Sequence, residues 1–142
     1  MKLKDVMSKD VASLNVSDAV IKAAQIMKEH NVGSVPVCDS NRVVGVITDR
    51  DIALRTVAEG KSADKQSVRD VMSTNPVVGQ PDMEVLDAAR IMGERQIRRL
   101  PIIEKNGLVG IVSLGDLALE PSLEDEASEA LTDISEPSTP EY

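Results

Sequence analysis

Two short motifs in this sequence combine residue types that can bind a phosphorylated or hydroxylated ligand. Thr48 and Asp51 are three residues apart, and Ser113 and Asp116 repeat the same spacing. At a helix start this spacing forms a capping box, in which the hydroxyl and the carboxylate accept hydrogen bonds from backbone amides. The same helix start also offers free amides and a hydroxyl to an anion, and the carboxylate can accept hydrogen bonds from both hydroxyls of a ribose. The spacing alone leaves both interpretations open.

The two motifs belong to an internal duplication that covers most of the chain. When the sequence is shifted by 65 residues, residues 5–55 align with residues 70–120 without a gap, and 17 of the 51 positions are identical. The run Asp-Val-Met-Ser, for example, occurs at 5–8 and again at 70–73. Such self-similarity indicates two copies of one structural unit.

Each copy predicts the element order β-α-β-β-α, preceded by a short helical lead. The first helix is indicated by apolar residues at positions i, i+3, i+4 and i+7, as at Val20, Ala23, Ala24 and Met27. Two β-rich runs joined by a polar turn follow, and a second helix closes the copy. We expect strands near Val11–Leu14 and Val77–Val78, helix starts at Ser17-Asp18 and Asp82, hairpin turns at Asp39–Arg42 and Asn106-Gly107, and closing helices at 49–58 and 114–119.

These elements predict an α/β (α+β) fold with two pseudo-symmetric repeats packed sheet to sheet. A copy of this length buries only about 60% of its extended surface, so that it is marginal alone and needs the other copy. We place repeat 1 at residues 1–60, with a connection to about 69, and repeat 2 at 66–120.

The tail at 121–142 is strongly acidic. It carries seven acidic residues and no basic one, and so accounts for seven of the eight net negative charges of the chain. A disordered tail is one interpretation of this composition. The other is a short amphipathic helix over 122–134 that docks on the repeats or on a partner. This alternative rests on the capping-box spacing of Ser122 and Asp125 and on apolar residues at helical spacing, namely Leu123, Ala127, Ala130, Leu131 and Ile134.

Composition excludes several classes of function. A single cysteine, Cys38, and a single histidine, His30, exclude an internal disulfide, a cysteine-based zinc cluster and a histidine-rich metal site. No phosphate-binding Gly-Lys-Ser/Thr loop, dinucleotide fingerprint or nucleophile elbow occurs, so we expect no enzyme. Residues 1–120 are nearly neutral, which argues against DNA binding, and no apolar run reaches the length of a membrane span. We therefore expect a cytoplasmic protein.

Arg98 and Arg99 stand directly before Leu100-Pro101 in repeat 2. Adjacent arginines are most often solvated surface residues, but the guanidinium group also binds phosphate well. The equivalent positions of repeat 1 are Gly33 and Ser34, so only one copy offers cations here.

The combined pattern resembles a tandem pair of cystathionine-β-synthase (CBS) domains, called a Bateman module. The resemblance rests on Asp-Val-Met at the entrance of each copy, a Val-Pro-Val or Leu-Pro-Ile strand, and Gly-h-h-(Thr/Ser)-x-x-Asp at the last corner, where h is an apolar residue. It covers about residues 1–120. It implies a regulatory module that binds AMP, ADP or ATP between the copies, with S-adenosylmethionine or NAD as less usual ligands, and that needs no cofactor for catalysis. It also implies a homodimer formed through helices and an unidentified regulated partner protein.

The resemblance further implies roles for individual residues. Asp51 and Asp116 would bind ribose hydroxyls, and Thr48 and Ser113 would bind phosphate oxygens. Backbone groups of the first strands would meet the adenine at Val11, Ala12, Val77 and Val78. Aliphatic side chains would flank the base, at Val35, Ile47, Ile97 and Val112. The alternative function is a structural dimerisation or interaction module without nucleotide binding, in which the corner residues serve only as caps.

The unequal distribution of arginines predicts unequal sites. In the family a ligand lies across both copies, so the Thr48 and Asp51 site would receive Arg98 or Arg99, whereas the Ser113 and Asp116 site would not. A charge-assisted hydrogen bond contributes roughly 1.5–3 kcal/mol, enough to separate two affinities by about tenfold or more. We expect titration calorimetry to find one dominant nucleotide per chain, weakened by salt and by Arg98→Ala/Arg99→Ala. Two equal sites, or unchanged AMP binding by the double variant, would contradict this expectation.

Overall fold

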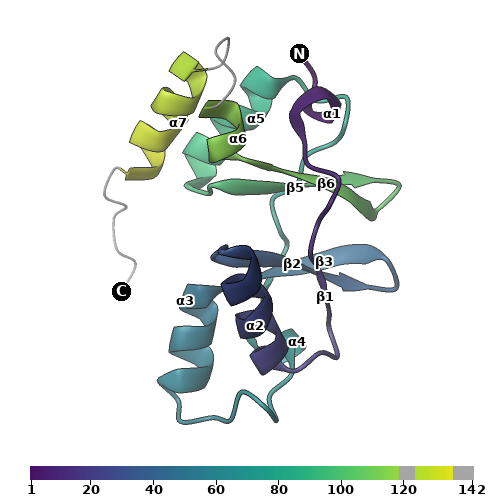
Figure 1. Cartoon of the computed structure of the whole chain (residues 1–142), viewed down its shortest axis with the longest axis vertical. Helices are drawn as coiled ribbons and strands as arrows, with labels where there is room; N and C mark the ends of the chain where they lie inside the picture. Colours follow the sequence, from purple (N-terminus) through teal and green to yellow (C-terminus); the bar gives the residue numbers. More distant parts are fainter. Residues whose placement is uncertain (119–123, 136–142) are drawn as a thin grey trace. The chain divides into compact units, whose positions relative to one another are not determined.

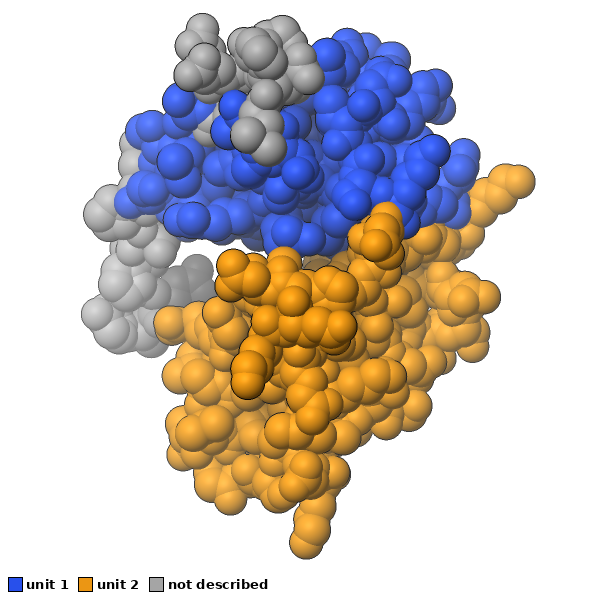
Figure 2. All heavy atoms as spheres, in the orientation of Figure 1, with its two compact units in different colours: residues 1–9, 78–104, 109–142 blue, residues 10–77, 105–108 orange. Residues whose placement is uncertain are grey.

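The chain folds into two compact units. The structure is a computed structural model that describes residues 1–118 and 124–135 (Figure 1). Unit 1 consists of Met1–Lys9, Val78–Glu104 and the chain from Val109 onward, and unit 2 consists of Asp10–Val77 and Lys105–Leu108 (Figure 2). The units therefore do not coincide with the two sequence copies.

The main helices and the hairpin strands of the copies recur at the same offset of 65 residues, whereas the two-residue strands β1 and β4 do not. Repeat 1 contains α1 (Leu3–Val6), β1 (Leu14–Asn15), α2 (Val20–His30), β2 (Ser34–Asp39), β3 (Arg42–Thr48), α3 (Asp49–Ile52) and the π-helical turn η1 (Ala53–Val57). Repeat 2 contains α4 (Val68–Val71), β4 (Ser73–Thr74), α5 (Val85–Arg95), β5 (Arg99–Glu104), β6 (Gly107–Ser113) and α6 (Leu114–Ala118). The mixed α+β class predicted from the sequence is confirmed.

Each copy carries a tight hairpin where the sequence predicts one. In unit 2, β1 pairs in parallel with β2, β2 pairs antiparallel with β3, and β3 pairs antiparallel with β4. The hairpin between β2 and β3 turns at Ser40 and Asn41, which both have positive φ, and Lys105 and Asn106 repeat this conformation in copy 2. Asn tolerates the left-handed region, which explains an Asn at the second turn position of both hairpins. Gly107, expected in the turn, instead opens β6.

The helix starts differ from the sequence expectation. The N-cap of α2 is Ala19 rather than Ser17 or Asp18, and the N-cap of α5 is Glu84 rather than Asp82. In repeat 1 the reason is local: the Asp18 carboxylate accepts a hydrogen bond from the Asn15 amide at 2.8 Å and so closes the preceding turn instead. The first strand of repeat 1 starts later than expected, at Leu14 rather than Val11. In repeat 2 the strand expected at Val77–Val78 is wrong, because the short strand β4 lies at Ser73–Thr74 and residues 77 and 78 are in no strand.

The closing helix of repeat 1 changes to a π turn after Ile52, whereas the sequence predicts one regular helix over 49–58. Side chains of this turn bond to the segment 66–72. The Arg55 guanidinium donates to the Val71 carbonyl at 2.8 Å, and the buried Thr56 hydroxyl donates to Gln66 at 2.6 Å. The π turn, which is wider than an α-helical turn, occurs together with these long-range hydrogen bonds. The periodicity of apolar residues in the sequence cannot reveal such bonds.

Each copy begins with a lead segment, residues 1–9 in repeat 1 and residues 66–77 in repeat 2. Each lead segment packs in the unit that holds most of the other copy. Residues 1–9 lie in unit 1 with most of repeat 2, where Ser8 pairs with Ile111 of β6. Residues 66–77 lie in unit 2 with repeat 1, where β4 pairs with β3. Each lead segment thus extends the sheet of the copy to which it does not belong in the sequence.

A glycine in each last strand makes this pairing possible. A Cβ atom on Gly45 would lie 2.7 Å from the Met72 sulfur and 2.8 Å from the Ser73 carbonyl oxygen. A Cβ atom on Gly110 would lie 2.6 Å from the Met7 sulfur and 3.0 Å from the Ser8 carbonyl oxygen. No side chain fits at either position unless the lead segment moves away.

Each unit has an aliphatic core. The core of unit 2 combines the inner face of α2 with β2, β3 and the lead segment; its buried residues are Leu14, Val16, Val20, Ala23, Met27, Val35, Val37, Ile47, Val68, Val71 and Met72. In unit 1, Leu3 from the lead segment is fully buried, as are Met92, Leu100, Ile102 and Leu117. Met27, Met72 and Met92 therefore fill core space, as expected, whereas Met7 is only half-buried.

Part of the acidic tail forms a helix. Helix α7 spans Glu124–Ser135 and packs against α5 and α6 within unit 1, which is visible as the yellow-green helix in Figure 1. Ala130 is buried on its inner side, whereas Leu131 is exposed. Leu123 and residues 136–142 lie outside the described residues.

The close approach of β3 to the lead segment yields a stability prediction. Gly45→Ala forces the Ser73 backbone to move, so we expect the free energy of unfolding to fall by about 1–3 kcal/mol, as for other overpacked sites. Gly115→Ala in α6 is the control, because its Cβ atom would meet only the Ser113 hydroxyl at 3.7 Å. Urea unfolding of both variants measures the difference. Equal stability of the two variants would contradict this account of Gly45.

Candidate functional site

The first corner lies where β3 leads into α3, and its side chains form a reciprocal cap. The Thr48 hydroxyl accepts a hydrogen bond from the Asp51 amide at 3.0 Å, and the Asp51 carboxylate accepts one from the Thr48 amide at 3.0 Å. The capping box that the spacing predicts is therefore confirmed.

Asp51 has two further partners that sequence analysis missed. The Ser73 hydroxyl lies 3.3 Å and 3.4 Å from the two carboxylate oxygens, and the Arg55 guanidinium lies 3.9 Å away. With only 9% of its surface exposed, Asp51 is the one buried acidic residue in the part of the chain that the structure describes. The (i, i+4) spacing of Asp51 and Arg55 is a signal that the sequence offered. Ser73 lies in the repeated Asp-Val-Met-Ser run, but only the exchanged lead segment brings it here.

The second corner repeats this geometry in unit 1. The Ser113 hydroxyl accepts from the Asp116 amide at 3.1 Å, and the Asp116 carboxylate accepts from the Ser113 amide at 3.1 Å. Asp116 is half-buried, so it is more accessible than Asp51. The Arg98 carbonyl accepts from the Leu114 amide at 2.8 Å, which ties the pre-proline segment to this corner. Gly33 and Asp49 make the equivalent backbone bond in unit 2, at 2.9 Å.

One of the paired arginines has an unpaired buried donor. Arg98 is exposed and Arg99 is half-buried at the start of β5. The Nε atom of Arg99 is buried and, among the described residues, has no hydrogen-bond partner. Buried donors in native proteins are nearly always paired, so an unpaired one at this place is consistent with a missing acceptor.

The structure divides the predicted aliphatic residues into two groups. Val35, Ile47 and Val112 are fully buried core side chains. The half-buried group is Val11, Ala12, Val77, Val78 and Ile97. Only the second group has surface left for a ligand in this conformation. Val11, Ala12 and Val77 belong to unit 2 with the first corner, whereas Val78 and Ile97 belong to unit 1 with the second corner.

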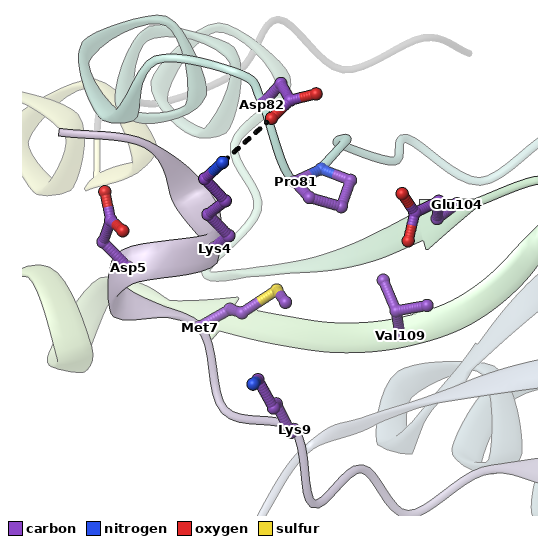
Figure 3. Close-up of a pocket in the computed structure, with 8 residues that line it drawn as sticks. All are labelled: Lys4, Asp5, Met7, Lys9, Pro81, Asp82, Glu104 and Val109. Atoms are coloured by element: carbon purple, nitrogen blue, oxygen red, sulfur yellow. Dashed lines mark hydrogen bonds and ion pairs between the residues drawn. The ribbon is translucent and has the colours of Figure 1, made fainter.

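A separate open cavity of about 560 Å³ lies in unit 1 (Figure 3). Its lining contains Lys4, Asp5, Met7, Lys9, Pro81, Asp82, Glu104 and Val109. Two of the lining residues, Lys4 and Asp82, form an ion pair at 3.4 Å. The lining holds charges of both signs and none of the corner residues, so the cavity is no extension of either corner.

The titrating groups with shifted pKa values lie outside the corners. A hydrogen bond and the charge of Glu84 raise the pKa of Lys2, and the same contacts with Lys2 lower the pKa of Glu84. Both groups are solvent-exposed, so this pair stabilises the lead segment only slightly. Partial burial raises the pKa of the Cys38 thiol in β2.

The described residues contain neither a metal-binding cluster nor a membrane-spanning helix. In residues 1–118 and 124–135, no cluster of His, Cys, Asp and Glu side chains has an arrangement able to bind a metal ion. Over the same ranges, no helix has both the length and the apolar character needed to span a bilayer.

Comparison with known proteins identifies the repeated unit. The CBS domain family model matches twice, at residues 3–56 and 68–122. The CBS domain-containing protein YhcV of Bacillus subtilis is 47% identical over 133 residues, which are 94% of each chain.

Two solved structures share the fold. The crystal structure of Hypoxic Response Protein I with two coordinated zinc ions has a TM-score of 0.77 at 30% identity, covering 84% of this chain and 98% of that one. The CBS domain pair of protein MJ0100, solved in complex with 5′-methylthioadenosine and S-adenosyl-L-methionine, has a TM-score of 0.73 at 27% identity, covering 84% and 94%.

The raised pKa of Cys38 predicts the pH dependence of its alkylation. The thiolate is the reactive form, so a raised pKa leaves less thiolate at a given pH. We expect the rate of reaction with iodoacetamide to rise at higher pH than for a cysteine peptide. In urea the profile should return to that of the peptide, because unfolding removes the burial. Identical profiles with and without urea would contradict the predicted shift.

Proposed function

Because this chain belongs to the CBS domain family and carries two CBS domains, we propose that it is a regulatory module that senses an adenosine-containing ligand. In this proposal the Thr48 and Asp51 corner and the Ser113 and Asp116 corner bind the ligand. The bound state is passed to a partner protein, without catalysis and without a cofactor. AMP, ADP and ATP are the first candidates, and the cytoplasm is the proposed location.

The observation that supports this proposal best is the convergence of hydroxyl, carboxylate and helix amides at both corners. In each unit the side-chain oxygens of the motif meet at the first turn after the last strand, within 3.1 Å of backbone amides. Such a turn attracts negative groups, and the carboxylate next to it suits a ribose. A pair with the same fold was solved with two adenosine-containing ligands.

Binding at the first corner requires an exchange of partners. Asp51 already interacts with the Thr48 amide, the Ser73 hydroxyl and Arg55. A ribose that takes the place of the Ser73 hydroxyl exchanges one hydroxyl–carboxylate hydrogen bond for one or two others of the same kind. Ligand binding at this corner is therefore coupled to the lead segment that carries Ser73.

For the phosphate we propose Arg98 and Arg99. Arg98 is exposed, and the unpaired Nε of Arg99 is a donor that an anionic oxygen would satisfy. Bidentate contacts of this kind favour phosphorylated ligands over adenosine. For the base we propose the half-buried residues Val11, Ala12, Val77, Val78 and Ile97, supported from behind by the buried Val35, Ile47 and Val112.

A second candidate function is a structural interaction module that binds no nucleotide. It is favoured by the complete set of partners that Asp51 has within the protein itself, since a carboxylate so well paired needs no ligand. In that case both corners serve only as helix caps.

We further propose that the chain forms a homodimer through its helices, as the resemblance to CBS pairs implies. In unit 2 three large apolar side chains are exposed on adjacent helical segments: Ile21 on α2, Leu54 and Val57 on η1. Exposed apolar clusters of this kind often mark association surfaces.

Ligand binding distinguishes the two candidate functions. A thermal-shift panel with AMP, ADP, ATP, S-adenosylmethionine and NAD should raise the melting temperature for at least one of them, because a ligand that binds only the folded state stabilises it. We expect Asp51→Ala to lose this shift at one site and to lower the free energy of unfolding by about 1 kcal/mol through the lost cap.

Asp49→Ala is the matched control. Asp49 lies in the same first turn and carries the same charge, but its carboxylate is exposed and bonds only to the adjacent Arg50 amide at 2.8 Å. The control should retain the ligand-induced shift. No shift with any ligand, or equal shifts for both variants, would favour the structural module.

A further inference from the structure

Asp51 and Asp116 stand at equivalent positions of the two copies, but their carboxylates have different surroundings. Each accepts a hydrogen bond from a backbone amide of its own corner, at 3.0 Å and 3.1 Å. The Asp51 carboxylate also has the Ser73 hydroxyl, at 3.3 Å and 3.4 Å from its two oxygens. Within residues 1–118 and 124–135, Asp116 has no such second donor. The acceptor that the proposed function offers to a ribose is therefore already in use at the first corner.

The other lead segment carries a serine at the same place, so the residue type does not explain the difference. Ser8 is the counterpart of Ser73, and the two serines are placed alike in their sheets. Ser73 pairs with Val46 of β3, and Ser8 pairs with Ile111 of β6, which is the counterpart of Val46. In the described part of the chain, however, the Ser8 hydroxyl donates to no carboxylate. The two copies thus contain the same serine in a bonded and an unbonded form.

An arginine that only repeat 1 has holds the lead segment next to Asp51. The Arg55 guanidinium donates to the Met72 carbonyl at 3.2 Å and lies 3.9 Å from the Asp51 carboxylate. Because Met72 directly precedes Ser73, this bond fixes the backbone from which the serine side chain reaches Asp51. The counterpart of Arg55 is Glu120, whose carboxylate has no donor to offer and which lies outside the described residues. The serine contact therefore goes together with an arginine that repeat 2 lacks.

The contact between Ser73 and Asp51 is suited to displacement. Hydrogen bonds between two oxygen atoms are most often about 2.7–2.8 Å long. The two distances here, 3.3 Å and 3.4 Å, are longer, so the hydroxyl holds the carboxylate weakly. Ser73 is an exposed residue, so its hydroxyl can bond to water when it leaves Asp51. A ribose hydroxyl is the same kind of donor and competes for the same carboxylate oxygens.

We propose that the Ser73 hydroxyl is an internal competitor for Asp51, which lowers the affinity of the first corner for a ribose-containing ligand and leaves the second corner unaffected. The inference rests on the proposed function and adds a residue that sets the affinity of one of its two corners. It compares the first corner with and without the hydroxyl, so it does not depend on which corner binds more tightly. The net contribution of one hydrogen bond corresponds to a change of about two- to tenfold in affinity.

The test compares two serine variants of the full-length chain. Ser73→Ala removes the competing hydroxyl. Ser8→Ala is the matched control, because Ser8 is also exposed and has the equivalent strand pairing. Each change is made in two chains that keep a single corner: Asp116→Ala leaves the first corner, and Asp51→Ala leaves the second. Titration calorimetry with AMP, ADP and ATP measures the affinities.

In the Asp116→Ala chain we expect Ser73→Ala to raise the affinity about two- to tenfold and Ser8→Ala to leave it unchanged. In the Asp51→Ala chain we expect neither change to alter the affinity, because the competing hydroxyl no longer has its carboxylate there. A first corner that binds nucleotide only after Ser73→Ala would support the proposal in its strongest form.

Urea unfolding without ligand tests the contact by itself. Ser73→Ala should lower the urea midpoint of the wild-type chain but not that of the Asp51→Ala chain, because residues in contact have non-additive effects on stability. Ser8→Ala should have the same small effect with and without Asp116→Ala. Additive effects of the Ser73 and Asp51 changes would show that the contact does not exist in solution and would overturn the proposal.

The binding experiment separates failure of the competition from failure of the proposed function. Nucleotide binding at the first corner that Ser73→Ala leaves unchanged or weakens would overturn the competition alone, because the corner would still be a binding site. Binding at the second corner only, even after Ser73→Ala, would also overturn the competition. Absence of binding in every variant would remove the proposed function, and the competition with it.

Discussion

The close contact between a strand glycine and an exchanged lead segment is the constraint on which the rest of the structure depends. Gly45 and Gly110 admit backbone from the lead segment of the other copy to within 3.0 Å of where a Cβ atom would lie. That approach lets Leu3 and Val68 fill the cores of units to which they do not belong in the sequence. Neither copy has a complete core without the other, so duplication here is a condition of folding and not a doubling of an independent domain.

The geometry of the first corner also depends on the exchanged lead segment. Thr48 and Asp51 cap a helix by local rules, but Asp51 is buried because the lead segment of repeat 2 brings Ser73 against its carboxylate. Arg55 connects the same lead segment to the closing helix through the Val71 carbonyl. In the proposed function, a ligand that takes the place of the Ser73 hydroxyl on Asp51 would change the packing of the lead segment, which is a physical route from a binding event to a change elsewhere in the chain. The proposed sensor function draws on that coupling.

Small departures from the internal symmetry have large consequences. Gly33 and Lys28 of repeat 1 are replaced by Arg98 and Gly93 in repeat 2. The first exchange gives a guanidinium group to the pre-proline segment of repeat 2, where repeat 1 has no side chain. The second removes a side chain from α5, so that α7 can dock on that helix and not on α2. The helices α2 and α5 and the two hairpins keep the same offset, so the copies differ here in side chains that stand on a similar backbone.

Local rules were enough to predict much of this protein from its sequence. Several features follow from periodicity, turn chemistry and the spacing of Thr48 and Asp51: the duplication, the element order, both hairpin turns and both capping boxes. They can be predicted because they depend on residues that are close together in the sequence. The shift of the α2 start, the π turn after Ile52, the exchange of lead segments and the partners Ser73 and Arg55 depend on contacts between segments far apart in the sequence. Only the tertiary structure decided these, together with the docking of α7 on Gly93, since periodicity shows which face of a helix is apolar but not what covers it.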